Sequence, residues 1–276
     1  MPAITTNIAA NSAVRYLNIN SNQETSALSK LSSGSRITSA SDDAAGLAIS
    51  TRISSDVTAL QQAATNAAQA NAILQTADGG ASNISDILAR MKSLASESAS
   101  GTTVASSRPY IDAEFQQLTS EIDSIANGTR YSGQTLLNAT SPFAGTGVSV
   151  LVGSSSTDTI NISLSNLTSA TLFAAATLDV TSATNAGTAL TALDTAINTV
   201  STARAQIGAQ ESRFNFSADS IQTQTQNLQA ANSAIRDVDV AAEQAILSSA
   251  EVKTQAAVSA ETAANQMPQY LLKLLG

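Results

Sequence analysis

The residues best suited to chemistry in this sequence are two pairs of aspartates. Asp42 and Asp43 are adjacent, and Asp237 and Asp239 are separated by one residue. Paired carboxylates can divide the acid and base roles of a hydrolase. Asp237 and Asp239 would project from different helix faces, because residues two apart do not face each other. Asp42 and Asp43 follow Ser41 at the start of an apolar pattern, where acidic side chains favour a helix N-terminus. Capping therefore explains this pair without catalysis.

The other residue types that usually support catalysis are missing. The sequence contains no Cys and no His, which are the commonest zinc ligands, and His is also the commonest general base. Gly145-x-Gly147 has Val150 where a dinucleotide-binding loop needs a third glycine, and it does not open a helix. No nucleophile–base pair or metal cluster is evident. We therefore expect a protein that is not an enzyme and that holds no cofactor.

The charge pattern excludes two further classes of protein. The 276 residues include 13 basic and 21 acidic side chains, and no block of Lys or Arg is present. Binding to nucleic acid needs clustered positive charge, so we expect no nucleic-acid partner. No stretch approaches the roughly 18 consecutive apolar residues of a membrane span, and we expect no membrane partner. The first 17 residues lack the basic and apolar regions of a cleavable signal peptide.

Residues 190–235 predict the helix around which the rest of the chain is organised. Every seventh residue in one column is apolar: Leu193, Val200, Ile207, Phe214, Ile221, Leu228 and Ile235. The interleaved column starts at Leu190 and becomes polar at Arg204 and Glu211. This spacing is the seam of a helix that packs on other helices, with a length of roughly 70 Å. Aromatic residues make up only 3% of the chain, which favours thin, elongated packing.

Three further elements are predicted before this helix. A second seam runs from residue 44 to 99 and includes Ile53, Leu60 and Leu74; it resumes almost in phase after Gly79-Gly80, so we expect one continuous helix. A shorter helix starts at Pro109 and ends at Asn127-Gly128. The alternating runs 148–152 and 159–164 predict a β-hairpin.

The two ends of the chain carry weaker patterns. Residues 3–33 have a sparse heptad through Ala10, Val14, Leu17, Leu28 and Leu31. This pattern fits either a frayed helix or a segment that orders only against partner chains. A change of phase at residues 236–239 predicts a joint, followed by a seam of small residues through Val238, Ala242, Ala245, Ser249, Val252, Ala256, Ala260 and Ala263. The apolar tail at residues 265–276 could dock on its own core, but we favour contact with another subunit.

Together these patterns predict a mainly α fold: an elongated antiparallel helical bundle or coiled-coil rod with a small β-hairpin region and paired terminal segments.

Several motifs match a known family. The runs Leu31-Ser-Ser-Gly-Ser-Arg-Ile37 and Asp42-Asp-Ala-Ala-Gly-Leu-Ala-Ile49 resemble the N-terminal signature of bacterial flagellins. Ile4-Thr-Thr-Asn7 and Arg213-Phe-Asn215 resemble flagellin segments too, as does the tail Ala264-Asn-Gln-Met-Pro-Gln-Tyr-Leu-Leu-Lys-Leu-Leu275. The resemblance covers both terminal parts, which form most of the chain.

The resemblance implies a structural subunit that polymerises into the flagellar filament and serves motility. It also implies two domains. Residues 1–40 pair with residues 240–276 as helices that form the inner tube of the filament, and residues 44–180 pack with residues 183–235 as a helical bundle with the hairpin at about 140–175. It implies a short flagellin without outer inserted domains, exported unfolded by the type III apparatus to the extracellular filament. The implied partners are other copies of the chain, an export chaperone, and the cap and hook-junction proteins. A hook–filament junction protein and a secreted protein that binds through amphipathic helices remain alternatives.

The resemblance and the seams together give the expected site residues. Subunit packing and helix seams are assigned to Leu17, Leu28, Leu31, Ile53, Leu60, Leu74, Leu193, Ile207, Phe214, Ile221, Leu228, Ile235, Val238, Val252, Leu271 and Leu274. Arg90, Leu94 and Glu114 resemble part of the flagellin surface seen by an animal innate-immune receptor. Ser93, Ser96 and Glu97 depart from the family pattern there, which argues against recognition.

Overall fold

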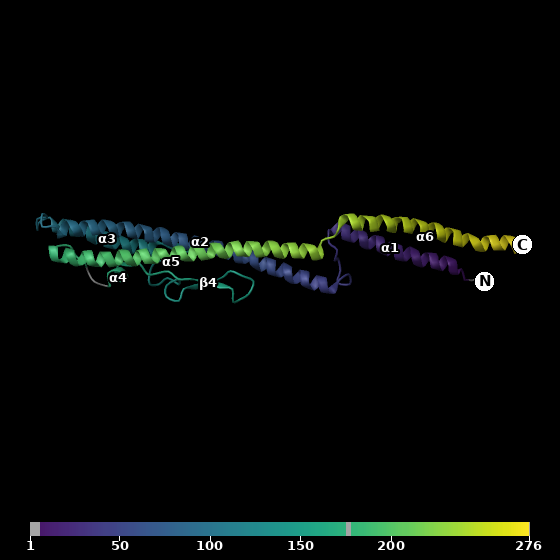
Figure 1. Ribbon diagram of the computed structural model, residues 1–276, viewed down its shortest axis with the longest axis horizontal. Coiled ribbons are helices and arrows are strands. Elements are labelled where there is room, and N and C mark those ends of the chain that lie inside the picture. Colours follow the sequence, from purple (N-terminus) through teal and green to yellow (C-terminus); the bar gives the residue numbers. More distant parts are fainter. Residues whose placement is uncertain (1–5, 175–177, 276) are drawn as a thin grey trace. The chain divides into compact units, whose positions relative to one another are not determined.

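The computed structural model describes residues 6–174 and 178–275, apart from the side chains of residues 268 and 271–275. The fold is mainly α, as predicted (Figure 1). The helices are α1 (Ile8–Ser33), α2 (Ala44–Ala99), α3 (Arg108–Gly128), α4 (Ser169–Leu172), α5 (Ala183–Arg236) and α6 (Val240–Leu275). The strands are β1 (Arg130–Tyr131), β2 (Gln134–Thr135), β3 (Val148–Leu151) and β4 (Thr159–Ile162).

Contacts divide the chain into two units. The terminal unit comprises residues 1–57 and 226–276, and the central unit comprises residues 58–225. Both boundaries fall inside long helices, α2 and α5, because the first turns of α2 and the last turns of α5 belong with the chain ends. The sequence suggested a division at the joints near residues 40 and 240 instead.

The predicted continuity of α2 through Gly79-Gly80 is confirmed. Gly80 is buried, and a Cβ atom there would lie 2.4 Å from Thr129 Oγ1 and 2.8 Å from Leu137 Cδ1. Gly79 has open space around it. Gly80 therefore allows the segment after α3 to approach the backbone of α2 closely, and this contact compensates for the low helix propensity of glycine.

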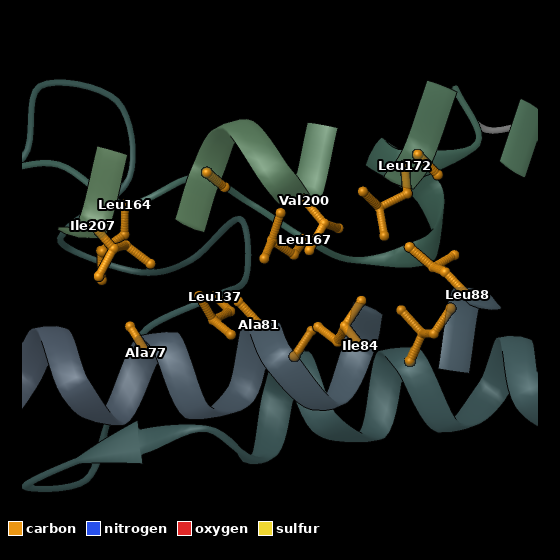
Figure 2. Close-up of a cluster of buried hydrophobic side chains, with 14 of the residues drawn as sticks. Ala77, Ala81, Ile84, Leu88, Leu137, Leu164, Leu167, Leu172, Val200 and Ile207 are labelled. Atoms are coloured by element: carbon orange, nitrogen blue, oxygen red, sulfur yellow. The ribbon is translucent and has the colours of Figure 1, made fainter. Parts of the chain in front are cut away.

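The core of the central unit lies among α2, α3, α5 and the segment that follows α3 (Figure 2). Ala77 and Ala81 leave room on α2, and the larger side chains of Leu137 and Leu167 fill it. Residues 136–173 thus supply apolar side chains that α2 and α5 lack. The face predicted for α3 is confirmed, since Phe115 and Ile122 are completely buried.

Two antiparallel hairpins follow α3. The predicted one is confirmed: Val148 pairs with Ile162 and Leu151 with Thr159. The other, β1–β2, was not predicted; it turns through Ser132 and Gly133, both with positive φ. A turn of this type places two left-handed residues between strands too short to show alternation.

In the terminal unit, α1 packs on α6 (Figure 1). The joints that lead out of α1 and into α6 pair with each other: Arg36 N donates to Arg236 O (2.6 Å) and Val238 N donates to Gly34 O (3.2 Å). Asp239 Oδ1 accepts from the amides of Ala241 and Ala242 at 3.0 and 3.1 Å, which caps α6. The predicted joint at residues 236–239 is therefore confirmed.

Candidate assembly surface

The face of α1 that packs on α6 is a heptad seam that combines Ala with Leu and polar side chains. Its least exposed positions follow three–four spacing: Ala10, Ala13, Leu17, Asn20, Glu24, Ala27 and Leu31. Only Ala13 and Ala27 are buried. The sequence pattern of α1 also included Val14 and Leu28, and both lie outside the face that packs on α6: Val14 is exposed and Leu28 is 58% exposed.

The matching face of α6 has the same spacing, through Glu243, Leu247, Ala250, Thr254, Ala257, Glu261 and Ala264. Three contacts between the helices fix an antiparallel register. Asn7 Nδ2 donates to Ala264 O (2.8 Å), Thr254 Oγ1 donates to Glu24 Oε2 (3.3 Å), and Lys30 lies 4.0 Å from Glu243. Polar groups inside a seam specify register at a cost in stability.

The seam predicted for α6 lies on a different face. Val252 is 66% exposed, Val238 is half-buried, and the small residues predicted with them are exposed. Because α6 is rich in Ala on every side, composition alone does not distinguish its faces. The exposed face is a column of small side chains that would let another helix approach closely.

Large apolar side chains in the terminal unit point away from the seam. On α1 they include Ile8 (69% exposed) and Tyr16 (63%), and on α6 Ile246 (50%), Met267 (60%) and Tyr270 (63%). The seam between α1 and α6 thus buries mainly Ala, while larger side chains remain in solvent. Exposed apolar faces of this kind are typical of interaction surfaces.

The seam of α5 is buried as predicted in the central unit. Leu193, Ile207, Phe214 and Ile221 are at most 3% exposed, and Leu60 and Leu74 on α2 are at most 2% exposed. In the terminal unit the remaining predicted positions are half-buried: Leu17, Leu31, Ile53, Leu228 and Ile235. Leu271 and Leu274 have side chains outside the described residues.

Polar pairs interrupt the apolar contact of α2 with α5 in the central unit. Arg204 donates to both carboxylate oxygens of Asp78, from Nε at 2.9 Å and from Nη2 at 3.2 Å. Glu211 lies one heptad after Arg204 on α5. Its burial raises its pKa, and the negative charge of Asp78 raises the pKa further. Asn71 Nδ2 donates to Asn215 Oδ1 at 2.7 Å. These pairs fix the register of the two long helices.

Of the adjacent aspartates, Asp43 caps α2 as the sequence predicted, whereas Asp42 stabilises the turn that precedes the helix. Asp43 Oδ1 accepts from Gly46 N at 2.8 Å at the start of α2. Asp42 Oδ2 accepts from Ser39 N and from both the amide and hydroxyl of Thr38. These hydrogen bonds lower the pKa of Asp42 to about 2, and the bond from Ser39 N makes the largest contribution. These bonds therefore favour the ionised form of the Asp42 carboxylate.

Arg90 and Glu114 lie on the surface of the central unit and form an ion pair, with Arg90 Nη2 2.7 Å from Glu114 Oε1. Leu94 is only 2% exposed and belongs to the core.

Residues 6–174 and 178–275 bring together no cluster of acidic side chains that could hold a metal ion. Among these same described residues, no helix combines the length and apolar character of a membrane span.

The fold and its paired chain ends define a helical structural protein built around two long antiparallel helices. A family model described as the bacterial flagellin N-terminal helical region matches residues 4–141, and one described as the bacterial flagellin C-terminal helical region matches residues 190–275. The chain belongs to the bacterial flagellin family. It is a structural subunit of the flagellar filament, which serves motility.

Relatives match nearly the whole chain. The flagellin of Halalkalibacterium halodurans is 38% identical over 270 residues, and the match covers 98% of each chain. The flagellin of Listeria monocytogenes is 35% identical over 283 residues, which covers 99% of each chain. A crystal structure of Bacillus cereus flagellin has a TM-score of 0.52 at 31% identity, covering 61% of this chain and 94% of that one.

A structure described as a flagellar hook-associated protein from Vibrio parahaemolyticus has a TM-score of 0.58 and covers 71% of this chain and 100% of that one. At 15% identity this likeness concerns the fold alone.

Sequence reasoning missed the exposed apolar side chains of α1 and α6, such as Ile8, Tyr16 and Ile246. On α1 a signal was present, because Ile8 and Tyr16 lie outside the three–four column that includes Ala13 and Ala27.

Proposed function

We propose that copies of this chain polymerise through the outward apolar faces of α1 and α6. The observation that carries this proposal is the distribution of side-chain size in the terminal unit. Ala13, Ala27 and Ala250 occupy the buried seam, while Tyr16 and Val252 are more than 60% exposed. Burying such side chains against neighbouring copies gains about 25 cal/mol per Å² removed from water.

Within this proposal the predicted packing residues divide into two groups. Leu28 and Val252 contact neighbouring copies directly. Buried residues of the central unit, such as Leu193 and Phe214, act indirectly, because they hold the unit that each copy presents to the next.

A matched pair of variants in α6 tests the proposal. Val252→Glu places a carboxylate on the outward apolar face, and Gln255→Glu places one at a nearby exposed polar position. We expect Val252→Glu to block filament formation, measured by negative-stain electron microscopy, and Gln255→Glu to permit it. Filaments of normal length from Val252→Glu would contradict the proposal.

Deletion of residues 240–276 is the coarser test. Without α6, the helix α1 loses the only long helix described against it, so we expect a soluble, partly helical monomer that forms no filaments. Circular dichroism measures the remaining helix, and sedimentation measures the association state. Filaments formed by the truncated chain would overturn the assembly model.

The route to the filament forms a second proposal, supported by membership of the family. The chain is exported unfolded by the flagellar type III apparatus, and an export chaperone covers residues 240–276 beforehand. Cap and hook-junction proteins meet it outside the cell. We expect inactivation of the export apparatus to remove the chain from the culture medium. Unchanged secretion would contradict this route.

The chain performs no catalysis in this account, and its apolar helix faces bind protein and not lipid. The net charge of −8 opposes attraction to anionic bilayers. Co-sedimentation with vesicles of anionic lipid tests this choice. We expect the chain to stay in the supernatant, and pelleting with the vesicles would favour a membrane-active protein.

A further inference from the structure

The end of α3 carries the dipeptide Asn127-Gly128, a sequence with intrinsic covalent chemistry. The backbone nitrogen of the glycine can attack Asn127 Cγ because glycine has no side chain to hinder it. A nitrogen–carbon bond forms, the bond from Cγ to the side-chain nitrogen breaks, and ammonia leaves with the displaced proton. Water then opens the cyclic imide at either carbonyl to give aspartate or isoaspartate. Asn is a thermolabile residue for this reason.

In the structure the side chain of Asn127 is held from both sides although the residue is exposed. Its Nδ2 donates to Asp123 O at 2.8 Å, and its Oδ1 accepts from Asn138 Nδ2 at 3.0 Å. Asn138 is itself 8% exposed and is anchored by Thr135 Oγ1 and by Thr140 N. We call these hydrogen bonds of Asn127 and Asn138 the clamp. The clamp connects the end of α3 with the segment that follows β2.

The backbone of this dipeptide is equally unfavourable for attack. Both residues belong to α3, and the helix ends only at Thr129, whose amide and hydroxyl both donate to Ile125 O at 2.8 and 2.7 Å. In a helix the amide of residue i+1 points along the axis, while the side chain of residue i projects outward. Attack on Cγ requires the last turn of α3 to open.

We propose that Asn127 is a latent deamidation site, silent in the folded central unit and reactive whenever the end of α3 is open. Aspartate or isoaspartate at residue 127 cannot make the same hydrogen bonds as the parent asparagine. A carboxylate lacks the donor for Asp123 O and places negative charge in the last helical turn, where the helix dipole disfavours it. Deamidation therefore records the time that a chain spends unfolded, and the modified chain refolds with a weakened α3 terminus.

The full-length chain tests this directly. The native chain and the chain in denaturant are held at the same mildly alkaline pH and temperature, and peptide mapping by mass spectrometry follows aspartate and isoaspartate at residue 127. We expect Asn127 to react faster than any other Asn of the denatured chain, and to react at least tenfold more slowly in the native chain. Equal rates in the two states, or a different Asn reacting first in denaturant, would overturn the proposal.

Two variants separate the chemistry from the clamp. Gly128→Ala adds a methyl group in open space, so the chain should fold normally while the denatured rate falls severalfold. Asn138→Ala removes one arm of the clamp, and the native rate at residue 127 should rise while the denatured rate stays unchanged. An unchanged native rate in folded Asn138→Ala protein, verified by circular dichroism, would show that the clamp does not protect the site.

Discussion

The central and terminal units use the same heptad spacing for different purposes. In the central unit the positions of the α5 seam carry large side chains that are almost completely buried, among them Leu193 and Phe214. In the terminal unit the buried positions of α1 and α6 are mainly Ala, among them Ala13, Ala27 and Ala250, and several large apolar residues are exposed to solvent. The central unit completes its core within a single chain, and under the proposed function neighbouring copies complete the core of the terminal unit. The same heptad spacing therefore accompanies two different extents of burial.

The largest effect on stability should come from removing a large side chain from the buried α5 seam of the central unit. Phe214→Ala removes a completely buried ring, and we expect a loss of about 3–5 kcal/mol in the free energy of unfolding. Phe216 lies two residues away and is 73% exposed, so Phe216→Ala should change stability by no more than about 0.5 kcal/mol. Denaturant unfolding followed by circular dichroism measures both. Similar losses for the two variants would show that the central seam is not a completed core.

A smaller loss is expected from the terminal seam. Leu247 is 8% exposed and is the largest buried residue on the α6 face that packs on α1. Leu247→Ala should cost about 2 kcal/mol, near the lower end of the range for leucine, because few atoms surround it. Ile246 is 50% exposed, and Ile246→Ala should leave the monomer unchanged but weaken polymerisation. Thermal unfolding of dilute monomer and the critical concentration for assembly distinguish the two roles.

Alanine substitutions at the two adjacent glycines of α2 should change the free energy of unfolding in opposite directions. Gly80→Ala places a methyl group against Thr129 and Leu137, and we expect a net loss of about 1 kcal/mol once the gain in helix propensity is subtracted. Gly79→Ala meets nothing within 4 Å and should gain about 0.5–1 kcal/mol. Unfolding in urea measures each change. Stabilisation by both substitutions would show that α2 does not need its close contact at Gly80.

The smallest effect concerns the pH dependence of the central unit. The pKa of Glu211 is raised in the folded chain, so folding favours its protonated form. Its unfavourable contribution is therefore absent below the unfolded value near 4.5 and grows as pH rises through the raised pKa. Glu211→Gln should raise the melting temperature at pH 7 relative to the parent chain and leave it unchanged at pH 4. An equal difference at both pH values would show that Glu211 titrates normally.

Much of the fold could be predicted because large residues repeat along the central helices. The column from Leu193 to Phe214 gave α5, and the pattern beyond Gly79-Gly80 gave a continuous α2. The β1–β2 hairpin was missed because two-residue strands are too short to alternate. The face of α1 that its own chain buries could not be predicted, because a pattern weighted by size selects Val14 and Leu28, whereas the buried positions are Ala13 and Ala27. Sequence shows where a helix is apolar, but not which apolar face its own chain covers.

Hydrogen exchange of the full-length chain, as dilute monomer and as filament, tests the central claim most directly. We expect amides of the central unit, such as those of residues 190–221, to be strongly protected in both states. Amides of residues 8–33 and 240–264 should exchange rapidly in the monomer and become protected in the filament. Full protection of the terminal segments in the dilute monomer would contradict the account, because the terminal unit would then be complete without its neighbours.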